Sequence, residues 1–327
     1  MSAPQSILIC RLSALGDIVL SQPVAAGLRA AYPDAHIAYL ARRPLGRILS
    51  ACAEIDALHE WEGGHAGLPP GVAEREWELV VDLSATGRSR RLLRGVRRQR
   101  VLRASKQSVR RRALVMCRAL GTWRFHVDPA VDRTLSVLKK ANIPVLSRRP
   151  RLAVNGTPNP SRVLLAPGGG RALKRWAPSR FSGIGRRVTE AGGSVVIAGA
   201  ADERALLEEV AGGIPQGSVE IRAGEDPERL PEVVAECGVA LTNDSGLLHV
   251  AEAVGVPVVA VFGATHPDLG FGPLDSASTV IHTGISCSPC DIHGPNRCRY
   301  AHGRCLTDIS EEQVWLAVES RMRSEAS

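Results

Sequence analysis

At 327 residues the chain exceeds the roughly 250 to 300 residues at which one hydrophobic core usually stops growing, so two domains are expected. Hydrophobic residues make up 44% and charged residues 23%, a balance that excludes a disordered chain. The net charge of +8 fits nucleic acid, anionic lipid or a phosphorylated substrate. No apolar run approaches the roughly 20 residues of a membrane span, and the N-terminus lacks signal-peptide features, so we expect a cytoplasmic protein.

The first half of the chain alternates short apolar runs with helical patterns. SILIC (6–10) and HIAYLAR (36–42) have the composition of strands, and the segment GDIVLSQPVAAGLRAAY (16–32) between them has that of a helix. WELVVDLS (77–84) predicts a further strand. This order implies a parallel sheet covered by helices, which is a Rossmann-like α/β domain.

The second half repeats this architecture after a proline-rich interruption. Four prolines fall within NIPVLSRRPRLAVNGTPNPSR (142–162), and we place the domain boundary near residues 144–160, giving domains 1–150 and 151–327. New strands are predicted at VLLAP, SVVIAG and GVALT. Two such domains imply a cleft between them, with ligands at the carboxyl ends of the strands.

One loop after a predicted strand has the composition of a phosphate-binding turn. In APGGGRALKRW (166–176), Gly168, Gly169 and Gly170 allow backbone N–H groups to approach a ligand closely, and Lys174 follows with two arginines beside it. The loop lacks the P-loop pattern and G-x-G-x-x-G, which disfavours ATP hydrolysis and ordinary NAD binding. The alternative is a tight turn with solvated basic side chains.

A second loop joins two apolar runs through four small or polar residues. TNDSGLLHV (242–250) predicts strand, turn and helix, with Asp244, Ser245 and Gly246 in the turn. The helix N-terminus favours an anion there. Alternatively, Asp244 or Ser245 merely caps the helix.

In the loop RLSALGD (11–17) after the first predicted strand, Asp17 is a candidate general base. The alternative is that Asp17 caps a helix that begins at Ile18. Composition does not separate these two interpretations.

The stretch from Arg88 to Arg118 contains twelve arginines and one lysine, and no acidic residue occurs between Leu83 and Val127. The roughly helical spacing of its apolar residues predicts a folded segment with one basic side. No aromatic residue lies among these arginines, which disfavours nucleic acid as a partner. An anionic acceptor at a membrane surface fits the same charges, and a merely solvated face is the alternative.

Four of the eight cysteines cluster in CSPCDIHGPNRCRYAHGRC: Cys287, Cys290, Cys298 and Cys305. This spacing predicts a structural Zn²⁺ or iron-sulfur site, with reduced thiols or two disulfides as alternatives.

Several of these stretches, in chain order, resemble one family, glycosyltransferase family nine, the ADP-heptose:lipopolysaccharide heptosyltransferases. The stretches that carry the resemblance are RLSALGDIVLSQPVAAGLRAAYPDAHI, VVDLSATGRSRRLL, APGGGRALKRWAPSRF, AGAADE, TNDSGLLHVAEAVGVPVVAVFGATHPDLGFGP and CLTDISEEQV.

The resemblance implies a GT-B fold, in which two Rossmann-like domains with parallel sheets face a central cleft. It implies an acceptor-binding N-terminal domain and a C-terminal domain that binds the nucleotide-sugar donor and carries the Cys-rich loop and a C-terminal helix. The implied reaction is inverting transfer of heptose from ADP-L-glycero-D-manno-heptose to the lipopolysaccharide inner core, without a cofactor in catalysis.

The resemblance also implies residue roles. Asp17 matches the base that deprotonates the acceptor hydroxyl, Lys174 the lysine that contacts the diphosphate, and Glu203 the carboxylate that holds the ribose. Asp244, Ser245 and Gly246 match the donor loop. Relatives often have hydroxyl side chains where Gly169 and Gly170 stand, so here backbone N–H groups are expected to do more of the phosphate binding. Arg88, Ser89 and Arg91 are the implied acceptor contacts. The implied partners are ADP-heptose, a Kdo-lipid A type acceptor and the anionic inner leaflet.

Two rival functions remain open at this stage. The first is a glycosyltransferase of the same fold with another nucleotide sugar or glycan acceptor. The second is a non-catalytic nucleotide-sugar-binding or assembly protein.

Overall fold

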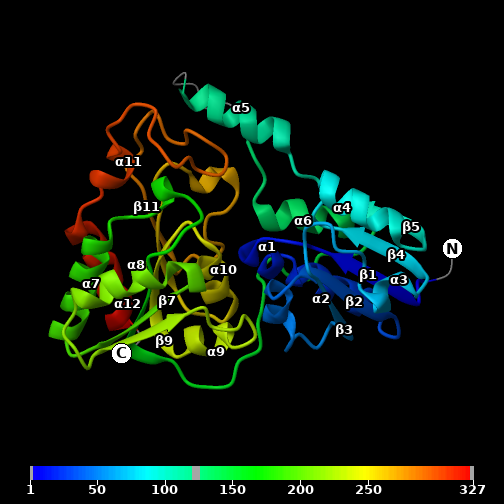
Figure 1. Cartoon of the computed structure of the whole chain (residues 1–327), viewed down its shortest axis with the longest axis horizontal. Helices are drawn as coiled ribbons and strands as arrows, with labels where there is room; N and C mark the ends of the chain where they lie inside the picture. The colour runs from blue at the N-terminus through cyan, green and yellow to red at the C-terminus, as the bar shows by residue number, and fades with distance from the viewer. Residues whose placement is uncertain (1–2, 120–125, 325–327) are drawn as a thin grey trace. The chain divides into compact units, whose positions relative to one another are not determined.

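Two parallel sheets organise the chain, one in each of two units (Figure 1). The computed structural model describes residues 3–119 and 126–324. Unit 1 comprises Met1–Lys106, Ala130–Ala153 and Asp226–Arg229, and unit 2 comprises Gln107–Pro129, Val154–Glu225 and Leu230–Ser327. Each unit therefore takes in a segment from the other half of the sequence.

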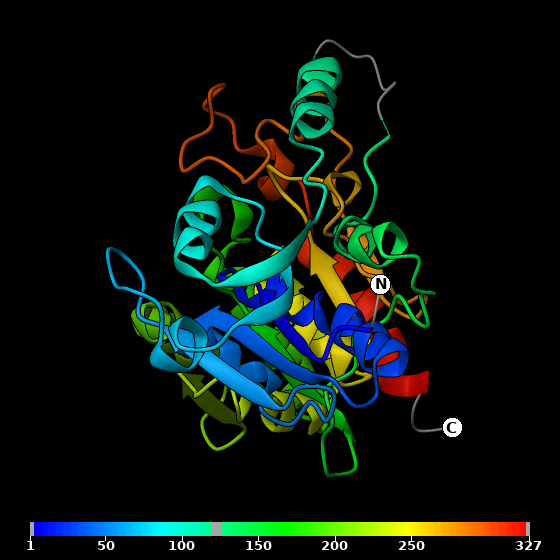
Figure 2. The same ribbon diagram turned by 90° about the vertical axis from the view of Figure 1, so that its right-hand side faces the viewer.

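The sheet of unit 1 has the strand order β3-β2-β1-β4-β5, and all of its neighbouring strands are parallel. All residues of β1 are buried, as expected for a strand covered on both faces. The strands run side by side in blue to cyan in Figures 1 and 2. Their bounds are β1 Ser6–Cys10, β2 His36–Arg42, β3 Ala57–Trp61, β4 Trp77–Asp82 and β5 Arg98–Arg103.

Where the sequence predicts one helix after β1, the structure has two, separated by Leu20 and Ser21. Pro23 lies in the first turn of the second helix, where its missing N–H costs no hydrogen bond. The helices of unit 1 are α1 Leu15–Val19, α2 Gln22–Ala31, η1 Leu45–Leu49, α3 Pro70–Ala73, α4 Gly87–Leu92, η2 Leu93–Gly95 and α6 Ala130–Lys140.

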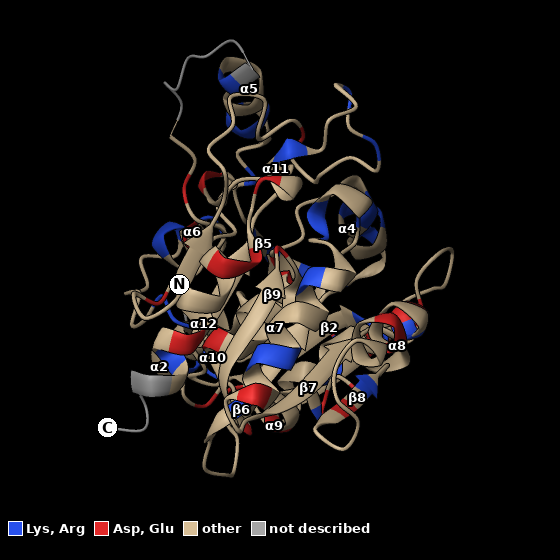
Figure 3. Ribbon diagram, turned by 90° about the vertical axis from the view of Figure 1, so that its left-hand side faces the viewer, with Lys and Arg blue, Asp and Glu red and all other residues tan. Residues whose placement is uncertain are grey.

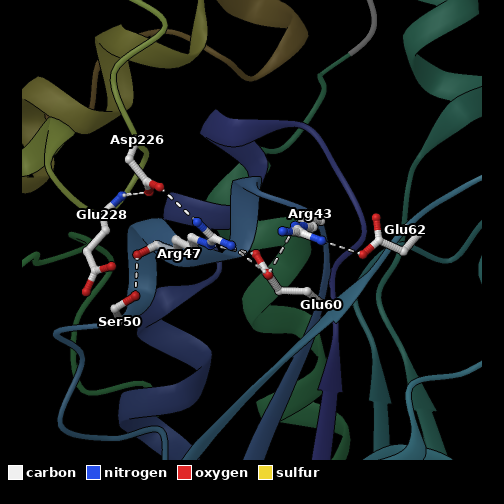
Figure 4. A network of polar contacts seen from close by, with 7 residues as sticks. All are labelled: Arg43, Arg47, Ser50, Glu60, Glu62, Asp226 and Glu228. Atoms are coloured by element: carbon white, nitrogen blue, oxygen red, sulfur yellow. Dashed lines mark hydrogen bonds and ion pairs between the residues drawn. The ribbon is translucent and has the colours of Figure 1, made fainter.

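Residues 226–229 are held in unit 1 by a network of charged side chains around η1 (Figure 4). The guanidinium of Arg47 contacts Asp226 Oδ2 at 2.9 Å and Glu60 Oε1 at 3.0 Å. Glu60 and Asp226 together raise the pKa of Arg47 above its usual value. The Glu228 N–H, at 3.1 Å from Asp226 Oδ1, is the largest cause of the lowered pKa of Asp226. The network thus joins η1, β3 and residues 226–229.

The sheet of unit 2 has the order β11-β10-β9-β6-β7-β8, again with parallel neighbours. All residues of β9 are buried. Val, Leu and Ile side chains of β6, β7, β9 and β10 supply much of the apolar core. The strand bounds are β6 Asn159–Ala166, β7 Ser194–Gly199, β8 Val219–Ala223, β9 Cys237–Asn243, β10 Val258–Val261 and β11 Thr279–Ile281.

Helices pack on both sides of this sheet. Helix α7 contacts α8 and α12, whereas α9 and α10 contact each other, and Figure 1 shows the two groups on opposite sides of the strands. Within residues 3–119 and 126–324, no helix is long and apolar enough to cross a membrane. The helices of unit 2 are α5 Ser108–Ala119, η3 Ala172–Lys174, α7 Pro178–Glu190, η4 Ala201–Glu203, α8 Arg204–Gly212, α9 Leu230–Ala235, α10 Gly246–Ala253, η5 Pro267–Leu269, α11 Arg304–Thr307 and α12 Glu311–Ser324.

The arginine-rich stretch is folded, as its apolar spacing predicts, but it is helical only in parts. Helix α4 ends at Leu92 and η2 follows it to Gly95. The next element, β5, is an edge strand of the sheet of unit 1, whereas α5 belongs to unit 2. Both α4 and α5 contain arginines, which colour parts of the two ribbons blue in Figure 3. One basic sequence segment therefore contributes to two separate units.

Candidate functional site

The turn at the end of β9 uses Asn243 to fix the glycine loop. The Asn243 amide accepts a hydrogen bond from the Trp176 N–H at 3.0 Å and donates to the Pro167 and Gly168 carbonyls at 2.8 and 3.1 Å. Asn243 is fully buried. Because these bonds span both ends of the loop, Asn243 holds the backbone of Gly168 in place from the neighbouring strand.

Asp244 fixes the lysine that follows the glycines. Its Oδ2 lies 2.8 Å from Lys174 Nζ and accepts the Thr265 hydroxyl at 2.7 Å. The side chains of Lys174 and Asp244 are only 17% and 12% exposed. A charge pair this buried is held in a defined geometry by its hydrogen bonds. Asp244 therefore does not cap α10, which was one alternative from the sequence.

Ser245 and Gly246 form the N-terminus of α10. Ser245 is the N-cap residue and has extended backbone dihedrals, but its side chain makes no capping bond. Ser245 Oγ is buried and has no hydrogen-bond partner among the described residues. A buried hydroxyl without a partner costs free energy unless a ligand or water completes it. Together with the N–H groups of the first turn, this hydroxyl suits an anion.

The glycine loop between β6 and η3 is braced by Glu203. Glu203 Oε1 accepts the Gly169 N–H at 2.9 Å, and its Oε2 accepts the Ala200 N–H at 3.1 Å. Arg175 Nε donates to the Gly169 carbonyl at 2.7 Å. A Cβ on Gly168 would lie 2.2 Å from Glu203 Oε2, so a larger residue here would displace the Glu203 carboxylate. The structure therefore brings the predicted ribose carboxylate against the predicted phosphate loop.

In unit 1, Asp17 lies in α1 at the carboxyl end of β1. The helix begins at Leu15 with Ala14 as its N-cap, so it does not start at Ile18 as the capping alternative supposed. Asp17 does have a capping role, because it lies in the first turn and its side chain accepts the N–H of the N-cap residue, as in a capping box. Asp17 Oδ2 accepts the Ala14 N–H at 3.2 Å, and Oδ1 pairs with the Arg11 guanidinium. The Asp17 side chain is 23% exposed.

The three predicted acceptor residues lie on α4, and they differ in exposure. Arg88 and Arg91 are exposed, whereas Ser89 is fully buried. The Ser89 hydroxyl donates to Asp82 Oδ2 at 3.1 Å, and its N–H donates to Thr86 Oγ1 at 3.0 Å. Ser89 thus anchors the start of α4 to the end of β4.

The cysteine cluster contains free thiols in different environments. Burial is the main cause that raises the pKa of Cys290, and it raises that of Cys305 to about 11. Backbone N–H groups, first that of Gly303, lower the pKa of Cys298. Cys287 Sγ lies 3.8 Å from His302 Nε2.

The predicted metal site at Cys287, Cys290, Cys298 and Cys305 has no formed ligand set. Across residues 3–119 and 126–324, no three His, Cys, Asp or Glu side chains are arranged to hold one metal ion. Two of the four cysteines contribute to packing, because Cys305 belongs to the core of unit 2 and Cys290 packs against it.

Three residues of this arrangement were not predicted from the sequence. Arg11 pairs with Asp17, Thr265 completes the bonding of Asp244, and Gly294 lies against the stem of Lys174. A Cβ on Gly294 would lie 2.8 Å from Lys174 Cγ. Thr265 and Arg11 both lie just after predicted strands, which is the only sequence signal that could have identified them.

Comparison with known proteins gives a consistent assignment. A model of glycosyltransferase family 9 (heptosyltransferase) matches residues 118–297. Lipopolysaccharide heptosyltransferase 1 of Pseudomonas aeruginosa is 25% identical, over 94% of this chain and 92% of that protein. The crystallised ADP-heptose heptosyltransferase II of Escherichia coli superimposes with a TM-score of 0.76 at 21% identity, covering 98% of this chain and all of that one.

Other matches are shorter. Lipooligosaccharide heptosyltransferase 2 of Haemophilus influenzae is 29% identical over 112 residues, which cover 33% of this chain. The match spans about a third of the length of this curated relative (32%). The likeness to solved structures confirms the fold predicted from the sequence, the GT-B class with two Rossmann-like parallel sheets.

Proposed function

Since this chain belongs to glycosyltransferase family 9, we propose that it transfers heptose from ADP-L-glycero-D-manno-heptose to the inner core of lipopolysaccharide. The observation that carries the proposal is the anion site of unit 2. The site supplies one cation from Lys174, one hydroxyl from Ser245 and several N–H groups from the N-terminus of α10. The Ser245 hydroxyl has no hydrogen-bond partner in the described part of the chain. This set suits the diphosphate of a nucleotide sugar.

Each proposed donor residue has a different role. Lys174 offsets the charge that develops on the leaving diphosphate, and Asp244 holds Lys174 in position. Gly170 and Gly246 offer backbone N–H groups to phosphate oxygens, whereas the Gly169 N–H is bonded to Glu203. Glu203 braces the glycine loop and, in the proposed role, holds the ribose hydroxyls at its edge.

Asp17 is the proposed general base. Its carboxylate takes the proton of the acceptor hydroxyl while that oxygen forms a bond to the anomeric carbon. The bond from the anomeric carbon to ADP breaks with its electron pair on the diphosphate. This single displacement inverts the anomeric centre.

The acceptor is proposed to bind unit 1. Arg88 and Arg91 are exposed on α4 and can contact phosphate or carboxylate groups of a Kdo-lipid A type acceptor. The same basic surface is proposed to contact the anionic inner leaflet of the cytoplasmic membrane. Ser89 is not part of this proposal, since its buried hydroxyl bonds Asp82.

Donor binding tests the proposal. Calorimetry with ADP-heptose is expected to show tight binding by the parent and about ten- to a hundredfold weaker binding by Lys174→Met, because a charge-assisted bond contributes about 1.5–3 kcal/mol. Lys139→Met, which removes an exposed lysine of α6, should bind like the parent. A parent that prefers UDP-glucose would contradict the donor, and equal binding by Lys174→Met would contradict the site.

A further inference from the structure

Arg11, which the sequence analysis did not single out, lies among the ends of β1, β2 and β4 in unit 1. Its backbone N–H donates to the Leu40 carbonyl at 3.1 Å, just inside the end of β2. Its Nη1 donates to the Leu83 carbonyl at 2.5 Å, just after β4. The side chain is only 13% exposed. The guanidinium is therefore held by the framework of the sheet and not by solvent.

The other terminal nitrogen of the same guanidinium pairs with Asp17. Nη2 contacts Asp17 Oδ1, while Asp17 Oδ2 accepts the Ala14 N–H. Both carboxylate oxygens thus have a donor, and the plane of the carboxylate is defined by two bonds from different directions. The planar guanidinium of an arginine can donate to a carbonyl and a carboxylate at once in a fixed geometry. The ammonium group of a lysine would supply the charge without this geometry.

We propose that Arg11 is a positioning residue, which holds the Asp17 carboxylate as an oriented anion ready to accept the proton of the acceptor hydroxyl. This inference rests on the proposed function, in which Asp17 is the general base. Arg11 acts through Asp17 and touches neither substrate. Proton transfer depends steeply on geometry, since a misplacement of about 1 Å can cost about a hundredfold in rate.

The test compares Arg11→Gln and Arg11→Lys with the parent in a heptose-transfer assay. Arg11→Gln should lower kcat about a hundredfold, because neither the charge nor the fork remains. Arg11→Lys should recover part of this loss, because it restores the charge alone. KM for ADP-heptose and the calorimetric affinity for ADP should stay within about twofold of the parent in both variants, since the donor site is in unit 2.

Arg29→Gln is the matched control. Arg29 also bridges carbonyls and a carboxylate in unit 1, through Pro33, Ala35 and Asp56. The Arg29→Gln substitution should lower the thermal midpoint, whereas kcat should stay near the parent value.

Three results would overturn the inference. If the parent transfers heptose and Arg11→Gln keeps its kcat within about twofold, Arg11 does not position the base. If kcat, donor affinity and the thermal midpoint fall together in both Arg11 variants, Arg11 has a structural role only. If the parent itself transfers no heptose, the proposed function fails first and this inference with it.

Discussion

At the scale of residues, the short segment Asn243–Gly246 gives each side chain a separate task. Asn243 fixes the glycine loop, Asp244 holds Lys174, and the Ser245 hydroxyl remains without a partner among the described residues. The sequence predicted the turn and its anion-binding character. It could not assign these tasks, because Asn243 bonds the loop around Pro167 and Asp244 bonds Lys174, which lie more than sixty residues earlier in the chain.

The same limit applies to Asp17. Its position after a glycine in the loop that follows β1 was visible in the sequence. The position of its partner Arg11 also depends on a bond to the Leu83 carbonyl, just after β4, which the sequence does not show. For the cysteines, the sequence pattern suggested more than the structure shows. Their spacing suggested a metal site, whereas the structure shows Cys305 buried in the core of unit 2 and Cys290 packed against it.

The thiols of the cysteine cluster should react at different rates. Backbone N–H groups lower the pKa of Cys298, whereas burial raises that of Cys305 to about 11, so at pH 7 the thiolate fraction is larger at Cys298. Brief iodoacetamide treatment followed by peptide mass mapping should find Cys298 alkylated before Cys305. Faster labelling of Cys305 would contradict these environments.

At the scale of elements, the loop between β6 and η3 depends on one close approach. A Cβ on Gly168 would meet the Glu203 carboxylate, which is only 15% exposed and already bonds Gly169 and Ala200. At Gly170 no heavy atom lies within 4 Å of an added Cβ. Gly168 and Gly170 look equivalent in the sequence, but they differ in how much room they leave for a larger side chain.

Gly168→Ala should lower the free energy of unfolding by about 1.5–3 kcal/mol, since it breaks hydrogen bonds to a charged acceptor. Gly170→Ala should change the free energy of unfolding by less than about 1 kcal/mol, and in the stabilising direction. Urea unfolding of both variants is the measurement. Equal destabilisation by the two substitutions would show that Glu203 does not brace this loop.

A second element-level feature is the carboxylate that joins α2 to β2. Burial alone would raise the pKa of Asp56, but the Ile37 N–H at 2.7 Å and Arg29 at 2.6 Å outweigh it, and the pKa is lowered. A carboxyl group with a lowered folded-state pKa adds stability above its unfolded pKa of about 3.9, and this stability is lost as the pH falls through the folded-state value.

Asp56→Asn should therefore lower the thermal midpoint at pH 7, and the difference from the parent should shrink below about pH 4. Asp34→Asn, at an exposed turn residue, should follow the parent at every pH. A difference that stays constant down to pH 2.5 would mean that the ionised carboxylate of Asp56 contributes nothing to stability.

At the scale of the whole molecule, the alternation of strand and helix patterns was enough to predict two parallel sheets. The family was predicted from the resemblance of several stretches in chain order. Buried strands such as β1 and β9 are continuous apolar runs that the sequence shows directly. The assignment of Gln107–Pro129 to unit 2 and of Asp226–Arg229 to unit 1 was not predictable. Both depend on long-range contacts, such as that between Arg111 and the Ile292 carbonyl.

The central claim is that the chain transfers heptose with Asp17 as base. The most direct measurement incubates the parent, Asp17→Asn and the control Asp34→Asn with ADP-heptose and a heptose-deficient core acceptor, and follows ADP release and acceptor mass. We predict that the acceptor gains one heptose with the parent and with Asp34→Asn, and that Asp17→Asn is slower by about a hundredfold or more. Transfer by Asp17→Asn at the parent rate, or no transfer by a parent that binds ADP-heptose, would contradict the claim.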